Sequence, residues 1–167
     1  VVLSPNPYRD RGLKAALEAQ RIMERSGAQT ALCLPFVPRK GDRVDVPRQL
    51  TLSSLEKELP SADLLVCFGG DGTMLTVSSL AAMHRVPLAG VNLGRLGFMT
   101  TCSVQELPLL AYALQEGSYL TDERSMLEVV RVGGDGVAAP PRKLALNEVS
   151  LIRAQSGKMV DLDAEID

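Results

Sequence analysis

A glycine-rich turn with one carboxylate is the part of this sequence best suited to chemistry. The segment 69–73, Gly-Gly-Asp-Gly-Thr, follows a continuous apolar run at 64–68, typical of a buried strand, and precedes a helix-like run at 74–83. Open α/β sheets bind phosphates at such turns, because glycines let backbone N–H groups approach the ligand closely. The pattern therefore predicts a phosphate site formed by Gly69, Gly70, Gly72 and Thr73.

Asp71 is the exceptional member of this turn. A carboxylate repels phosphates unless a metal ion is present or the acid has a chemical task, so Asp71 is the candidate catalytic residue. An ordinary turn-forming aspartate is the alternative. For Thr73, the alternative is a hydroxyl that only caps the following helix.

The elements around the turn predict an α/β domain with a parallel, doubly wound sheet, because strand-like and helix-like runs alternate. The strand-like runs lie at residues 1–4, 30–34, 64–68 and 87–92, and the helix-like runs at 13–26, 50–59 and 74–83. Residues 38–47 are expected to form a surface loop. Its basic side chains, Arg39, Lys40 and Arg43, either attract phosphates or are simply solvated.

The second half of the chain changes pattern. After a helix at 104–115, strands are predicted at 119–132, 144–152 and 159–166, with a proline-rich loop at 138–142. Strands in succession favour an antiparallel sheet. We therefore expect an α/β nucleotide-binding domain at 1–105, and at 106–167 a linker helix followed by an incomplete, mostly-β domain.

The letters Gly-Gly-Asp-Gly occur a second time, at 133–136, where they lie between two predicted strands. Glycine and aspartate are ordinary hairpin-turn residues there, so this copy is interpreted as a turn and not as a phosphate site.

Composition excludes several classes of function. Lys and Arg number 18 against 20 Asp and Glu, so no basic surface for nucleic acid is indicated. No apolar run approaches the length of a membrane helix. The chain begins in a strand-like run without a basic leader, so we expect a cytoplasmic protein with no membrane contact. The 3 cysteines have no metal-ligand spacing and are expected to be reduced and mostly buried.

The sequence resembles the NAD kinase family, of the bacterial type. The resemblance is carried by the segment 69–73, by Gly-Val-Asn-Leu-Gly-Arg-Leu-Gly-Phe at 90–98, and by Ala-Leu-Asn-Glu-Val at 145–149. The family continues into a Thr-Gly-Ser-Thr-Ala-Tyr segment that this chain lacks. We therefore expect that the C-terminal part of the enzyme is missing from this chain.

The resemblance implies an activity. NAD kinases transfer the γ-phosphoryl group of ATP, or of polyphosphate in some members, to the 2′-hydroxyl of the adenosine ribose of NAD, with a divalent cation, usually Mg²⁺. In this reading Asp71 accepts the proton of that hydroxyl, or only orients it. The alternatives are a lipid kinase of the same superfamily and a dinucleotide-binding module without catalysis.

The resemblance also implies the binding partners, NAD and ATP, and a homo-oligomer, either a dimer or a tetramer. The residues implied for NAD are Asp71, Gly72, Asn92, Phe98, Asn147, Glu148 and Lys158. Phe98 could instead pack in the core, and Asn147 and Glu148 could be ordinary polar residues of an edge strand. No metal site is assigned to side chains; Asp161, Asp163 and Asp167 share one strand face that is either solvated or a metal site.

Overall fold

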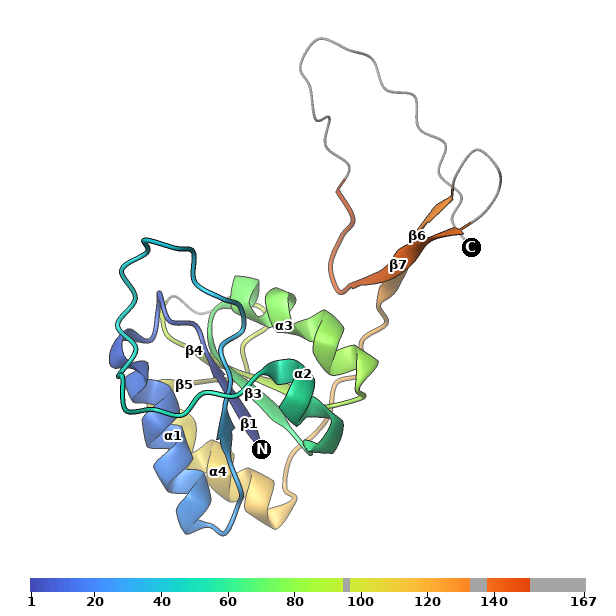
Figure 1. Cartoon of the computed structure of the whole chain (residues 1–167). Coiled ribbons are helices and arrows are strands. Elements are labelled where there is room, and N and C mark those ends of the chain that lie inside the picture. Colours follow the sequence, from blue (N-terminus) through green and yellow to red (C-terminus); the bar gives the residue numbers. More distant parts are fainter. Residues whose placement is uncertain (95–96, 133–137, 151–167) are drawn as a thin grey trace.

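The computed structural model describes residues 1–94, 97–132 and 138–150. Its main feature is a five-stranded parallel sheet in the order β2-β1-β3-β4-β5 (Figure 1). The strands are β1 (Val2–Pro5), β2 (Ala31–Leu32), β3 (Leu65–Gly69), β4 (Leu88–Asn92) and β5 (Cys102–Ser103). The predicted parallel α/β domain is thus confirmed.

Helices cover both faces of this sheet. They are η1 (Arg11–Leu13), α1 (Lys14–Arg25), α2 (Leu55–Glu58), η2 (Leu59–Ser61), α3 (Asp71–Met83), η3 (Val104–Glu106) and α4 (Leu107–Glu116). The helices α1 and α4 lie on one face, and α2 and α3 lie on the other (Figure 1). The chain is therefore doubly wound, as predicted.

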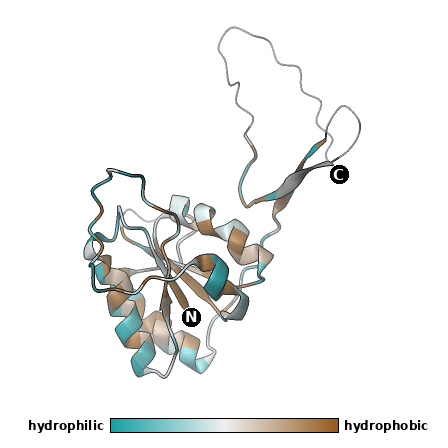
Figure 2. Ribbon diagram, viewed as in Figure 1, coloured by the Kyte–Doolittle hydropathy of each residue, from teal (hydrophilic) through white to brown (hydrophobic). Residues whose placement is uncertain are grey.

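The alternation of side chains along the strands divides the core into two layers. In β3, Val66 and Phe68 pack with α1 and α4, whereas Leu65 and Cys67 pack with α2 and α3. All of these strand residues are buried, which explains why the strand reads as one continuous apolar run. The sheet is accordingly the hydrophobic centre of the domain (Figure 2).

Local signals explain where α1 begins and ends. Both carboxylate oxygens of buried Asp10 accept hydrogen bonds at 3.0 Å, from the backbone N–H groups of Ala15 and Ala16. At the other end Gly27 has φ +86°, and the N–H groups of Gly27 and Ala28 bond back to carbonyls of the last turn. This is a glycine-terminated helix end, as the sequence predicts.

The short elements differ from the expectation. The helix predicted at 50–59 begins only at Leu55, because the Ser54 side chain caps it while Ser53 is still bridged to Cys33 beside β2. The strand β5 was not predicted, because two residues carry no periodicity.

A second sheet consists of β6 (Leu127–Val132) and β7 (Ala138–Ala145), which pair antiparallel as expected. The first strand is shorter than predicted, since residues 119–126 are not in a strand. The prediction of a proline-rich loop at 138–142 is wrong, because this segment lies within β7. Proline is tolerated on an edge strand, and the pairing register shifts opposite this segment, between Val129 and Arg131.

The turn at 133–136 and the strand at 159–166 lie outside the described residues. The boundary at residue 105 stays a prediction; α4, which follows it, buries Leu107 and Ala111 in the same core as α1. Within the part of the chain that the structure describes, no helix combines the length and apolar character needed to cross a bilayer.

Candidate functional site

The sheet order places the glycine-rich turn at a topological switch point. The chain moves outward from β1 to β2 on one side and from β1 to β3 on the other, so the order reverses between β1 and β3. Ligands of open α/β sheets bind at such a point, beyond the carboxyl ends of the strands. Asn6 follows β1 there, and the turn beginning at Gly70 follows β3.

Gly70 is the N-cap of α3, a helix of 13 residues, and Asp71 is its first residue. Gly70 has φ −141°, and a Cβ atom on either Gly70 or Gly72 would meet nothing within 4 Å. The free space above these residues is what a phosphate would need in order to approach the backbone.

Gly69 has a different reason to be glycine. A Cβ atom there would lie 2.7 Å from the Cβ atom of Thr73, whose side chain is buried against the strand end. Close packing within the protein therefore accounts for this glycine, and its predicted contact with phosphate stays a prediction.

Thr73 is not the helix N-cap, so that alternative is wrong: the cap is Gly70. The Thr73 hydroxyl instead accepts a hydrogen bond of 2.9 Å from Nδ2 of Asn6. Asn6 also accepts, through Oδ1, a 3.0 Å bond from the N–H of Tyr8. Sequence reasoning missed Asn6, although its position between prolines at the end of the first strand was a usable signal.

Asp71 connects the turn to the loop after β4. Its Oδ2 accepts the N–H of Phe98 at 3.0 Å, and its Oδ1 accepts the N–H of Met99 at 3.1 Å. A Cβ atom on Gly97 would lie 2.6 Å from Cγ of Asp71, so only glycine fits there. The carboxylate is thus held in one orientation by two loop amides, which an ordinary turn-forming aspartate does not require.

Phe98 is 98% exposed, so the alternative of core packing is wrong. Its backbone is tied to Asp71 while its ring projects into solvent. An exposed aromatic ring beside a fixed carboxylate is available for contact with a ligand.

Asn92 ends β4 and is buried. Its Oδ1 accepts a 2.8 Å bond from the N–H of Gly94, which shapes the loop leading toward Phe98. Asn92 also borders a cavity of about 370 Å³ at the ends of β4 and β5, together with Arg9, Leu93, Gly94, Ser103, Val104 and Gln105. The predicted position at the carboxyl end of its strand is confirmed, because Asn92 is the last residue of β4.

The third motif follows the second sheet. Asn147 and Glu148 are exposed and follow the end of β7, so the strand predicted at 144–152 ends earlier than expected. No hydrogen bond or ion pair joins either of them to the turn within the described residues. Lys158 and the aspartates at 161, 163 and 167 lie outside those residues.

The described residues do not form a metal centre of their own. Among them no group of three or more His, Cys, Asp or Glu side chains lies close enough to hold an ion. Mg²⁺ is commonly bound through one or two carboxylates together with the phosphates of a substrate.

Comparison with known proteins decides the family. A family model described as ATP-NAD kinase N-terminal domain matches residues 12–119. The chain belongs to the NAD kinase family. The match covers the whole glycine-rich turn at 69–73 and Phe98 and Met99, which bind Asp71.

Individual relatives agree with this assignment. An NAD kinase of Aromatoleum aromaticum is 43% identical over 122 residues, which are 71% of this chain and 39% of the relative. An NAD kinase of Bordetella avium is 32% identical over 160 residues, which are 96% of this chain and 52% of the relative. The chain thus spans only about two fifths to one half of the length of these relatives.

A solved structure supports the fold. The crystal structure of yeast NADH kinase complexed with NADH matches with a TM-score of 0.66 and 21% identity, covering 87% of this chain and 44% of the yeast chain. At this level of identity the comparison concerns the fold alone.

Proposed function

We propose that the protein to which this chain belongs is an NAD kinase, which phosphorylates the 2′-hydroxyl of the adenosine ribose of NAD with ATP to give NADP. The observation that carries the proposal is Asp71, a fixed carboxylate at the first residue of α3, in a family-matched turn at the switch point of the sheet. A carboxylate beside the expected phosphates needs a chemical task, and proton transfer is such a task.

The phosphates of ATP would lie above Gly70, Gly72 and the first turn of α3. Backbone N–H groups at a helix N-terminus are unpaired and carry partial positive charge, which favours an anion. The open space above the two glycines leaves room for this approach.

Asp71 would accept the proton of the attacking 2′-hydroxyl. A carboxylate offers about four lone-pair directions, and the two loop amides use only two of them. Phosphoryl transfer has a loose transition state, so a weak but well-positioned base is sufficient. If Asp71 only orients the hydroxyl, the same geometry is needed.

NAD would contact the other side of this carboxylate. Phe98 offers an exposed ring next to Asp71, suited to wall or stack on the adenine, and Asn92 shapes the loop that carries it. For the motif residues Asn147 and Glu148, and for Lys158, contact with NAD remains part of the proposal and rests on the family resemblance.

Mg²⁺, when bound with ATP, would neutralise charge on the transferring phosphoryl group. A cytoplasmic location and a homo-oligomeric state belong to the proposal as well.

The test is an assay of the full-length protein with ATP, Mg²⁺ and NAD, in which NADP is measured directly. Formation of NADP supports the proposal, and parallel reactions with diacylglycerol test the lipid-kinase alternative, which the family match does not favour. Binding of NAD without any turnover would instead identify a dinucleotide-binding module.

A further inference from the structure

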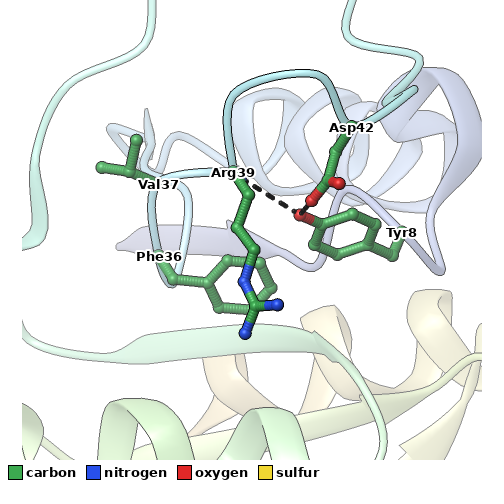
Figure 3. Close-up of a pocket in the computed structure, with 5 residues that line it drawn as sticks. All are labelled: Tyr8, Phe36, Val37, Arg39 and Asp42. Atoms are coloured by element: carbon green, nitrogen blue, oxygen red, sulfur yellow. Dashed lines mark hydrogen bonds between the residues drawn. The ribbon is translucent and has the colours of Figure 1, made fainter.

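A second cavity lies on the side of β1 away from β3 and the glycine-rich turn at 69–73. It has a volume of about 510 Å³ and is lined by Tyr8, Phe36, Val37, Arg39 and Asp42 (Figure 3). Tyr8 follows β1, and the other lining residues follow β2, the strand paired with β1. The cavity therefore lies at the carboxyl ends of neighbouring parallel strands, where open α/β sheets bind ligands.

The wall of this cavity is held in place by hydrogen bonds. The Tyr8 hydroxyl donates to the carboxylate of Asp42 and accepts from the N–H of Arg39 at 3.4 Å. The backbone N–H of Asp42 also donates to the carbonyl of Arg39 at 3.0 Å, and further along the loop the backbone carbonyl of Asp45 accepts the N–H of Gly12 at 2.9 Å. These bonds fix the loop after β2 against the segment after β1.

The chemistry of the lining fits a nucleotide. The rings of Tyr8 and Phe36 are stacked, with centroids 5.7 Å apart and planes inclined by 20°, and Tyr8 is 43% exposed. The side chain of Arg39 extends past these rings in Figure 3, and the described residues provide no ion pair for its guanidinium group. An aromatic platform accepts a flat base, and a guanidinium pairs with phosphate.

The cavity is linked directly to the phosphate turn. The N–H of Tyr8 bonds to Asn6 at 3.0 Å, and Asn6 bonds to Thr73 of the turn at 2.9 Å. Two hydrogen bonds therefore connect the segment that carries the aromatic platform to the turn expected to hold the phosphates.

We propose that this cavity is the base-binding part of the phosphoryl-donor site: the base of a nucleoside triphosphate stacks on Tyr8 and Phe36, and Arg39 pairs with a phosphate. The inference rests on the proposed function and adds residues that the glycine-rich turn does not contain. It also gives a role to Asn6, which positions Tyr8 relative to Thr73.

The test measures ATP and NAD binding to the full-length protein by calorimetric titration. Tyr8→Leu should raise the Kd for ATP about tenfold, because the stacking platform is lost, while the Kd for NAD stays within about twofold. Arg39→Ala should also raise the Kd for ATP. Lys40→Ala removes a neighbouring exposed basic side chain from the same loop and should leave that Kd unchanged. An unchanged Kd for ATP in a folded Tyr8→Leu variant, or equal losses for ATP and NAD, would overturn the inference.

A second readout does not depend on catalysis. Tyr8→Trp keeps an aromatic ring at the site. The tryptophan fluorescence of this variant, after that of the unchanged protein is subtracted, should be quenched by ATP but not by NAD. Quenching without any NADP formation in the assay would support the nucleotide site and reject the kinase proposal. NADP formation without quenching would support the kinase and reject this placement of the base.

Discussion

Asp71 has both a structural and a chemical part in the proposed site. Its carboxylate holds the loop after β4 through the N–H groups of Phe98 and Met99, and these two bonds leave part of its acceptor capacity unused. A change at this residue therefore affects both the base and the loop, and the two effects have to be separated by measurement.

The first prediction is that Asp71→Asn lowers kcat at least about 100-fold, because an amide cannot accept the proton. Asparagine retains one acceptor oxygen but turns an NH₂ group toward a loop N–H, so the KM for NAD should rise as well. Steady-state kinetics give both values, and thermal unfolding checks that the variant is folded. A variant that keeps most of its turnover would leave Asp71 only its role in holding the loop.

Gly97 allows the contact between the loop and Asp71 to be tested without removing the carboxylate. In Gly97→Ala, the new Cβ atom would lie 2.6 Å from Cγ of Asp71, so the loop must move. We expect a raised KM for NAD and a lowered kcat, because Phe98 and the Asp71 carboxylate are displaced together. Gly94→Ala is the matched control in the same loop, since its Cβ atom would meet nothing within 4 Å. Equal effects of the two substitutions would show that the Asp71 contact is unimportant.

Gly72 and Gly69 separate ligand approach from internal packing. Gly72→Ala places a methyl group in open space on a helix, so the free energy of unfolding should stay the same or rise by up to about 1 kcal/mol. ATP should bind more weakly to this variant, because the methyl group occupies the space that the phosphate needs. Gly69→Ala should instead destabilise the protein, because its Cβ atom would lie 2.7 Å from that of Thr73. Chemical unfolding and ATP titration of both variants provide the comparison. Unimpaired ATP binding by Gly72→Ala would argue against phosphate at this turn.

At the scale of elements, α1 depends on a residue outside the helix. Leu13 immediately before it has φ +51° and cannot cap it through its side chain, so Asp10 supplies both acceptors from four residues upstream. The segment between β1 and α1 thereby becomes a fixed connection that also carries Asn6 and Tyr8.

We predict that Asp10→Ala lowers the free energy of unfolding by about 1–3 kcal/mol, because it leaves two N–H groups of the first helical turn without partners. Asp10→Asn, which keeps one acceptor oxygen, should lose less. Urea unfolding measures both. If the segment between β1 and α1 also positions the cavity beside Tyr8, the affinity for ATP should fall in Asp10→Ala. An unchanged free energy of unfolding in this variant would contradict the capping role of Asp10.

At the scale of the whole molecule, the two-layered core buries thiols on one face of the sheet. Burial raises the pKa of Cys33 to about 11 and that of Cys67 to about 12, above the ordinary value of 9.0. The folded protein therefore keeps protons that the unfolded chain releases as the pH rises above that value. The contribution of the two protonated thiols to the free energy of unfolding is complete below pH 9, and it is lost as the pH rises toward their pKa values in the folded protein.

This gives a prediction about alkaline stability. The free energy of unfolding should fall between about pH 9 and pH 11, and the fall should be smaller in Cys33→Ala and Cys67→Ala than in the unchanged protein. Both thiols should resist alkylation at neutral pH until denaturant is added, because they are buried. Half-buried Cys102 is the internal comparison and should react first. Rapid alkylation of Cys67 in the native protein would contradict this core.

The sequence by itself determined the features that depend on neighbours along the chain. The continuous apolar strand, the glycine-rich turn and the following helix at 64–83 are local patterns, so the parallel sheet and the position of Asp71 could be predicted. The helix end at Gly27 follows from the conformational freedom of glycine. The family could be recognised because its motifs are also local.

Tertiary structure decided which distant residues meet. The hydrogen bond between Asn6 and Thr73 spans 67 positions, the bonds from Phe98 and Met99 to Asp71 span 27 and 28, and the bond from Tyr8 to Asp42 spans 34. No periodicity encodes such pairings, because they arise only when neighbouring parallel strands bring their carboxyl ends to one edge of the sheet. The exposure of Phe98 and the burial of Thr73 are decided in the same way, by packing between segments that local pattern does not relate.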